Sequence, residues 1–185
     1  MDVVASAVKG GATMVQLRHK DADTRELLEE ARELKAILDP QGVPLLINDR
    51  ADVALAARAA GVHVGQSDLP AIDARRILGP DAIIGLTVKT LEQVREAETL
   101  DVDYLGVGPV YPSPTKPDAG QALGPEGLRA FVQATRLPVV AIGGIGLENA
   151  KDVHACGVAG IAVVSAISAA GDPGAAARGL LACIV

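Results

Sequence analysis

The sequence predicts an α/β fold built on a parallel β-sheet, and three observations support this prediction. Short apolar runs alternate with amphipathic segments along the 185 residues. The runs are continuously apolar, as expected of strands that are buried on both faces of a parallel sheet. Glycine, proline and polar residues separate the two kinds of segment, which is where turns are expected. Regular alternation of strand and helix is the pattern of parallel βαβ units.

The first elements can be placed from their boundaries. Residues 2–9 form a short amphipathic segment that ends at Gly10 and Gly11, as a helix does. The apolar run 13–18 predicts a strand. Asp23 or Thr24 can cap the next helix. That helix carries an apolar stripe at helical spacing, formed by Leu27, Ala31, Leu34 and Leu38.

The same alternation continues along the rest of the chain. Further strands are predicted at 43–49, 62–66, 82–88, 104–110, 139–142 and 160–165. Further helices are predicted at 51–59, 71–78, 90–99, 125–135, 147–156 and 173–183. A proline-rich loop, 111–124, interrupts this rhythm. Loops of this length are usually functional.

Polar or glycine residues follow every predicted strand, and their spread distinguishes two architectures. A doubly wound open sheet concentrates function at one switch point, whereas a barrel gathers all strand ends around one mouth. The sequence therefore predicts a TIM (β/α)8 barrel, as one domain over residues 1–185. Because it has one strand fewer than a closed barrel, we expect the first β-strand to be lacking. The strands starting at Thr13 and Gly160 would then have free edges.

Composition excludes several classes of protein. The net charge is −6 and the aromatic residues are Tyr104, Tyr111 and Phe131, whereas a general nucleic-acid binder needs a basic face and stacking rings. Cys156 and Cys183 lack metal-site spacing, so reduced thiols in a cytoplasmic protein are expected. No membrane association is expected, because the longest small and apolar run is too short and too polar to span. No signal peptide is recognised at the N-terminus.

Two acids at strand ends predict a metal site. Asp49 follows the apolar run 45–47, and Asp68 follows the run 62–66. If these strands are parallel neighbours, the two carboxylates lie at the same end of the sheet. Such a pair suits a hard divalent cation held with waters and a substrate phosphate. The alternative is that Asn48, Asp49 and Asp68 only cap the following helices.

Basic and hydroxyl side chains after other strands predict phosphate binding. Gln16, Arg18 and Lys20 fall on one side of an extended segment, and the two cations could grip a polyphosphate. The Thr87 hydroxyl could donate to a phosphate oxygen. The alternatives are a charged surface loop and an ordinary β-branched strand residue. His63 lies within an apolar strand, where a satisfied core histidine is expected in preference to a catalyst.

Three later segments also carry chemistry. The run Pro-Ser-Pro-Thr-Lys-Pro at 112–117 predicts a lid over the barrel mouth, with a disordered surface loop as the alternative. Gly143-Gly144 and Val164-Ser165 follow the last two strands. They are typical of a barrel phosphate site made by backbone N–H groups and a helix N-terminus, although turns alone could also explain them.

Together these motifs resemble the thiamine-phosphate synthase family. They are QLRHK, LINDR, GVHVGQSDLP, GVGPVYPSPTKPDA, VAIGGI and GIAVVSAIS, and they occur in this order from about Gly10 to Ser168. The resemblance implies a Mg²⁺-dependent transferase of thiamine biosynthesis. It would join hydroxymethylpyrimidine diphosphate to a thiazole phosphate, by dissociative substitution, and release pyrophosphate. Relative to the family barrel, this chain is expected to be truncated before its first strand.

The resemblance also implies roles for individual residues. The pyrimidine diphosphate would be bound by Gln16, Arg18, Lys20, Asn48, Thr87 and Lys116, of which Arg18, Lys20, Thr87 and Lys116 would be catalytic. Asp49 and Asp68 would hold Mg²⁺. The thiazole phosphate would be bound by Ser113, Thr115, Gly144, Val164 and Ser165. Thr87 stands where the family often has serine, which keeps the hydroxyl.

The expected partners are therefore small-molecule substrates, with assembly into a homo-oligomer left open. Two alternative functions are also left open. One is a thiazole tautomerase-like isomerase, which would keep the phosphate loops without needing the diphosphate and metal residues. The other is an inactive truncated barrel that only binds thiazole phosphate.

Overall fold

The computed structural model describes residues 1–112 and 121–184, and a parallel sheet forms its centre. Within these residues the sheet has seven strands in the order β1 to β7. The strands are β1 (Val15–Leu17), β2 (Leu45–Asn48), β3 (Gly61–Val64), β4 (Ile83–Val88), β5 (Tyr104–Val107), β6 (Val139–Ile142) and β7 (Gly160–Ala162). Each strand pairs in parallel with the next one along the chain. The α/β class is confirmed, and a doubly wound sheet is excluded because its strand order would reverse at a switch point.

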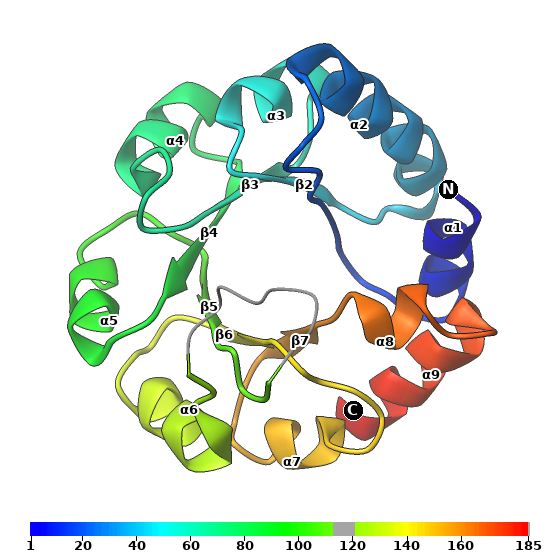
Figure 1. Cartoon of the computed structure of the whole chain (residues 1–185). Helices are drawn as coiled ribbons and strands as arrows, with labels where there is room; N and C mark the ends of the chain where they lie inside the picture. The colour runs from blue at the N-terminus through cyan, green and yellow to red at the C-terminus, as the bar shows by residue number, and fades with distance from the viewer. Residues whose placement is uncertain (113–120, 185) are drawn as a thin grey trace.

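Helices surround the curved sheet on its outer side (Figure 1). They are α1 (Asp2–Lys9), α2 (Thr24–Leu38), the 3₁₀ turn η1 (Asp39–Gln41), α3 (Ala51–Ala57), α4 (Ala71–Leu78), α5 (Leu91–Ala97), α6 (Gly124–Gln133), α7 (Ala150–His154), α8 (Ser165–Ser168) and α9 (Pro173–Ile184). The long helix α2 shows why the sequence folds in this way. Asp23 accepts a hydrogen bond from the Glu26 N–H at 2.9 Å, which caps the helix. The four predicted stripe residues, Leu27, Ala31, Leu34 and Leu38, are all buried.

Two predicted boundaries were wrong near the C-terminus. The structure begins α7 at Ala150 and not at residue 147, because Asn149 first closes a turn by accepting a hydrogen bond from the Gly146 N–H at 2.9 Å. The predicted strand 160–165 ends at Ala162, and the short helix α8 begins at Ser165. This helix is too short to leave a periodic apolar pattern in the sequence.

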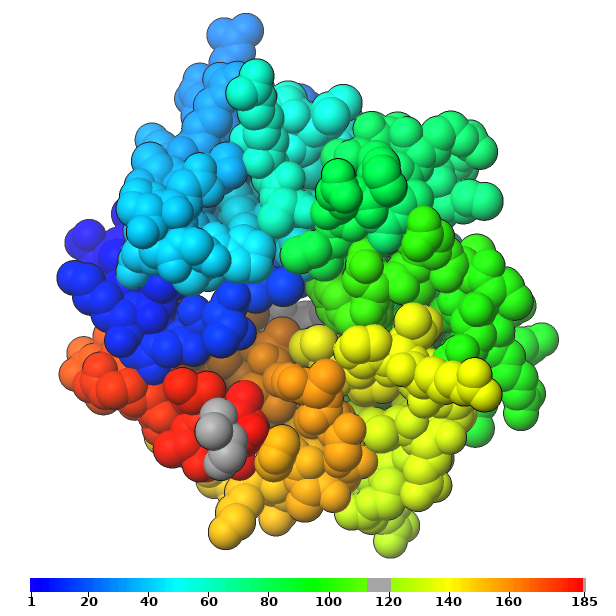
Figure 2. Space-filling model, turned by 180° about the vertical axis from the view of Figure 1, so that it is seen from behind, coloured from blue at the N-terminus to red at the C-terminus, as the bar shows by residue number. Residues whose placement is uncertain are grey.

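The described sheet forms an incomplete barrel with β1 and β7 as its two edges. All four residues of the inner strand β3 are buried, whereas β1 and β7 are partly exposed. The ends of the described chain meet on the outside, where α1 packs beside α9 (Figures 1 and 2). A Cβ atom at Gly10 would collide with the Gly174 carbonyl, so this helix contact needs glycine.

Two further expectations from the sequence concern membrane-spanning segments and the state of the two cysteines. Among the described helices, none has the length and apolar character that a membrane span requires. Cys156 and Cys183 are free cysteines, and Cys156 is buried.

Gly61 and Gly160 provide a matched test of strand packing, because each is the first residue of a strand. A Cβ atom at Gly61 would collide with the Ile83 carbonyl, whereas nothing lies within 4 Å of one at Gly160. We expect Gly61→Ala to cost roughly 3 kcal/mol or more of unfolding free energy. Gly160→Ala should be close to neutral. Urea denaturation measures both, and equal stabilities of the two variants would contradict this packing.

Candidate active site

The two predicted metal ligands follow neighbouring strands of the sheet. β2 and β3 are parallel, with Asn48 opposite His63. Asp49 continues this pairing, because its N–H donates to the His63 carbonyl at 2.8 Å. Asp68 lies in the loop after β3. The sheet therefore brings both acids to the same rim, as expected from their positions after the strands.

Neither acid serves as a helix cap, which removes the alternative explanation for them. The residue that precedes α3 is Arg50 and the one that precedes α4 is Pro70, and both helices begin without a side-chain cap. The Asp68 carboxylate instead accepts a hydrogen bond from the Gly65 N–H at 2.8 Å, across the loop that follows β3. The Asp49 backbone is in the left-handed region, with φ at 63°. Non-glycine residues rarely adopt this conformation, although aspartate tolerates it better than most.

Electrostatics show that four of the predicted residues interact. Burial raises the pKa of Asp49, and the hydrogen bond and negative charge of the Asp68 carboxyl raise it further. The positive charges of Lys20 and Arg18 act in the opposite direction on the same pKa. Two carboxyl groups and two cations are thus gathered from the ends of β1, β2 and β3. An oxygen donor pair of this kind fits a hard divalent cation, and the cations fit an anionic substrate.

Gln16 and Asn48 join the ends of β1 and β2. The Gln16 side-chain amide donates to the Asn48 side-chain carbonyl at 2.9 Å. β1 pairs with β2, and Asn48 directly precedes Asp49 in the sequence. The amide pair and the charged group therefore lie at the same end of the sheet.

Thr87 is held by a buried polar network that composition and spacing did not reveal. His63 Nε2 lies 2.7 Å from the Thr87 hydroxyl, and His63 Nδ1 lies 2.8 Å from the Tyr104 hydroxyl. His63 is only 8% exposed, so the prediction of a satisfied core histidine is confirmed. Burial raises the pKa of Tyr104 above its ordinary value, which already lies well above neutral pH, so its hydroxyl is protonated. Tyr104 was missed because it opens an apolar strand, where a tyrosine needs no special explanation.

Glycines make room for the imidazole ring of this network. A Cβ atom at Gly85 would collide with both His63 and Tyr104, and one at Gly106 would lie 2.9 Å from His63 Cε1. Gly85 is paired with His63 and Gly106 with Thr87 across the sheet. The pattern of glycines inside two adjacent strands was the available sequence signal for a large inward side chain between them.

The predicted phosphate loop after β6 is a tight turn packed against its neighbour. Gly143 and Gly144 have φ angles of 87° and 66°. A Cβ atom at Gly144 would lie 2.6 Å from the Pro112 carbonyl oxygen. The Asn149 amide donates to the Gly144 carbonyl at 2.9 Å and fixes the turn from the following helix. Sequence reasoning did not identify Asn149, whose signal was an asparagine shortly after a Gly-Ile-Gly segment.

The other predicted thiazole phosphate residues divide into two groups. Val164 and Ser165 follow β7, where Val164 is 64% exposed and Ser165 is the first residue of α8. Since β6 and β7 are parallel neighbours, Gly144 and Ser165 follow adjacent strand ends. Ser113, Thr115 and Lys116 lie outside the described residues.

Comparison with known proteins identifies relatives over nearly the whole chain. The family model described as thiamine monophosphate synthase matches residues 1–167. Thiamine-phosphate synthase of Albidiferax ferrireducens is 55% identical over 176 residues, which cover 95% of this chain and 80% of the relative. That of Vibrio parahaemolyticus is 50% identical over 97% of this chain and 88% of the relative.

Solved structures agree with these sequence matches. Thiamine phosphate pyrophosphorylase from Pyrococcus furiosus has a TM-score of 0.91 and 43% identity, covering 99% of this chain and 88% of that one. A 3-hexulose-6-phosphate synthase has a TM-score of 0.74 at 18% identity, covering 100% of this chain and 93% of that one, so it shares the fold alone. The resemblance seen in the sequence motifs is confirmed. The family match, the close relatives and the arrangement of strand-end residues lead to one conclusion: the chain belongs to the thiamine monophosphate synthase family.

Proposed function

We propose that the chain condenses hydroxymethylpyrimidine diphosphate with thiazole phosphate to give thiamine phosphate and pyrophosphate. The predicted class of function, a transferase of thiamine biosynthesis, is confirmed by the family and by relatives named thiamine-phosphate synthase. The observation that carries the proposal for this chain is the charged group at the ends of β1, β2 and β3. In this group, burial and the Asp68 carboxyl raise the pKa of Asp49, and the positive charges of Lys20 and Arg18 lower it.

The diphosphate is assigned to this charged group. Arg18 can bind phosphate oxygens through paired N–H groups, and Lys20 contributes a compact positive charge. Gln16 and Asn48 lie at the same rim, where their side-chain amides are hydrogen-bonded to each other. Thr87 offers a hydroxyl that lies 2.7 Å from His63 Nε2, which orients it. Lys116 completes the proposed catalytic set of Arg18, Lys20 and Thr87, although it lies outside the described residues.

Asp49 and Asp68 are assigned to hold Mg²⁺. The fit is supported by the donor chemistry, since both offer carboxylate oxygens, and burial together with the nearby Asp68 carboxyl raises the pKa of Asp49. A bound cation removes the electrostatic cost of placing two carboxylates together. When bound, Mg²⁺ supplies charge neutralisation to the departing pyrophosphate.

The chain's own residues then have a limited chemical task. The electron-rich aminopyrimidine can carry the positive charge that remains when the bond to its methylene carbon breaks. Arg18 and Lys20 stabilise the negative charge that develops on the leaving group. The thiazole nitrogen attacks with a free lone pair and has no proton to lose. The reaction therefore needs positioning and charge stabilisation, and it needs no general base.

The thiazole phosphate is assigned to the loops that follow β6 and β7. Gly144 brings its backbone close to the neighbouring loop, and Val164 and Ser165 begin the turn into α8. Ser113 and Thr115 belong to the proposed lid outside the described residues. In this arrangement the two substrates occupy opposite arcs of one rim.

Some finer expectations also remain proposals. We propose a single barrel domain whose closure requires a further strand between β7 and β1, where the described sheet has its two edges. A cytoplasmic location and assembly into an oligomer stay predictions.

The isomerase and the inactive-barrel alternatives are distinguished from the proposed reaction by one assay.

That assay incubates the purified chain with both precursors, with Mg²⁺ and with excess chelator. We expect thiamine phosphate and pyrophosphate to form only when both precursors and Mg²⁺ are present. An isomerase would convert a thiazole phosphate without the diphosphate, and an inactive barrel would release no pyrophosphate. Either result would contradict the proposed reaction.

Asp49→Asn should lower the activity while it raises the stability of the metal-free protein. The folded-state pKa of Asp49 is raised, so its ionised form lowers stability once the pH exceeds that pKa. Asparagine removes this charge and tolerates the left-handed backbone. We expect the Tm of the metal-free protein to rise by about 1–3 °C. Turnover with Mg²⁺ should fall on the order of a hundredfold or more.

Asp52→Asn is the matched control for that change. Arg50 lowers the pKa of Asp52 through a hydrogen bond, so the ionised form of Asp52 stabilises the fold at neutral pH. Neutralising this exposed acid should lower the Tm slightly and leave turnover unchanged. Full activity of Asp49→Asn, or equal Tm changes in both variants, would contradict the metal assignment.

Thr87 can be tested by separating its hydroxyl from its shape. Thr87→Val keeps the branched shape but removes the hydroxyl beside His63 Nε2. We expect kcat/KM for the pyrimidine diphosphate to fall about 10- to 100-fold. Thr87→Ser retains the hydroxyl and should retain most activity. Equal losses in the two variants would show that shape and not the hydroxyl matters.

A further inference from the structure

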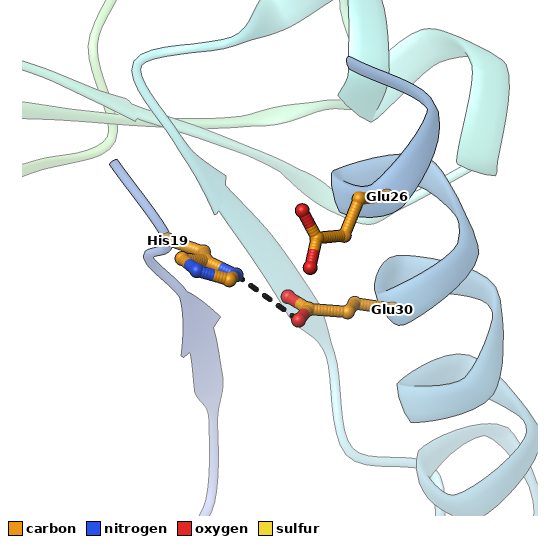
Figure 3. A group of neighbouring side chains, drawn as sticks. All are labelled: His19, Glu26 and Glu30. Atoms are coloured by element: carbon orange, nitrogen blue, oxygen red, sulfur yellow. Dashed lines mark hydrogen bonds and ion pairs between the residues drawn. The ribbon is translucent and has the colours of Figure 1, made fainter. Parts of the chain in front are cut away.

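Three metal-ligating side chains meet outside the groups assigned to the reaction. His19 lies in the loop that follows β1, and Glu26 and Glu30 lie one turn apart on α2. Figure 3 shows the imidazole pointing toward both carboxylates across the space between the loop and the helix. His19 and Glu26 are exposed and Glu30 is partly exposed, so an ion from solution can reach all three.

The local fold explains why these side chains converge. Residues four apart share one helix face, so the two glutamates project in the same direction. The cap from Asp23 to the Glu26 N–H fixes the first turn of α2, and buried Leu27 anchors the adjacent face. His19 Nδ1 lies 3.0 Å from the Glu30 carboxylate, which holds the loop against the helix.

The distances are close to those of a metal site. One ligand atom from each residue can be chosen so that all three lie within 4.8 Å of one another. Tetrahedral nitrogen and oxygen ligands about 2.0–2.2 Å from a common ion lie about 3.3–3.6 Å apart. Binding would therefore draw these exposed side chains together by rotation of about an ångström.

We propose that His19, Glu26 and Glu30 form a site for a borderline divalent metal ion, with Zn²⁺ as its representative. One imidazole nitrogen and two carboxylate oxygens are a donor set that Zn²⁺ accepts, with a fourth position left for water. Mg²⁺ prefers oxygen ligands and octahedral geometry, so the site differs in chemistry from the Asp49 and Asp68 pair. This proposal does not depend on the reaction proposed above.

Binding has a structural consequence for the β1–α2 loop. The ion would join His19 to α2 more firmly than the single contact to Glu30 does. His19 is flanked in the chain by Arg18 and Lys20. The ion would therefore order the backbone of the loop that carries both cations. A ligand that binds only the folded state also raises its stability.

The test is a Zn²⁺ titration of the full chain without Mg²⁺, in a Cys183→Ser background because the partly exposed thiol of Cys183 could itself bind zinc, whereas Cys156 is buried. The chain has three histidines, so imidazole NMR signals can report on each one. We expect the His19 signals to shift with one equivalent of Zn²⁺ while those of His63 and His154 stay unchanged. The Tm should rise with Zn²⁺ concentration.

Variants make the assignment specific. His19→Asn and Glu26→Gln should each weaken Zn²⁺ binding on the order of tenfold or more, since loss of even a residue that only hydrogen-bonds a metal ligand costs ~10–100-fold. The matched controls Glu29→Gln and His154→Asn change exposed residues outside the cluster and should bind as the parent does. Absence of binding to the parent, or unchanged affinity in either cluster variant, would overturn the proposal. Because the side chains of His19 and Glu26 are exposed, both variants should fold as the parent does. Their Tm values without metal check this.

Discussion

Pairing of every strand with the next one along the chain is the constraint on which the proposed site depends. Leu17 pairs with Ile47, and Asn48 pairs with His63. These pairings bring residues from distant parts of the sequence to one rim, because the carboxyl ends of parallel strands point the same way. A slip of one residue in any pair would turn that strand's side chains to the opposite face. The register therefore decides which polar residues can act together.

Asp49 concentrates two unfavourable features at this rim. Its backbone is in the left-handed region, and its pKa is raised by burial and by the Asp68 carboxyl. Each feature lowers the stability of the metal-free fold, while Lys20 and Arg18 offset part of the electrostatic cost. Strain and perturbed ionisation at one residue are typical of functional sites. This combination supports a ligand role for Asp49 more strongly than its place after a strand does.

The sequence was sufficient where a local pattern and its burial agree. The stripe on α2 and a cap at Asp23 or Thr24 were predicted, because helical spacing and capping chemistry act within a few residues, and the structure uses Asp23. Hydrophobic periodicity failed where a turn side chain or a distant partner decided the outcome. The start of α7 depends on the turn that Asn149 closes, and the role of Tyr104 depends on a histidine two strands away.

The alternation of parallel strands and helices, the acids at two strand ends and the family motifs can all be read from the amino-acid sequence. These properties are local, since they follow from hydrophobic period, turn residues and residue type. The paired strands were needed to show that Asp49 and Asp68 do not cap helices and share one electrostatic environment with Arg18 and Lys20. They were also needed to show that His63 links Tyr104 to Thr87 across neighbouring strands. Such contacts depend on register and burial, which exist only once the strands have paired.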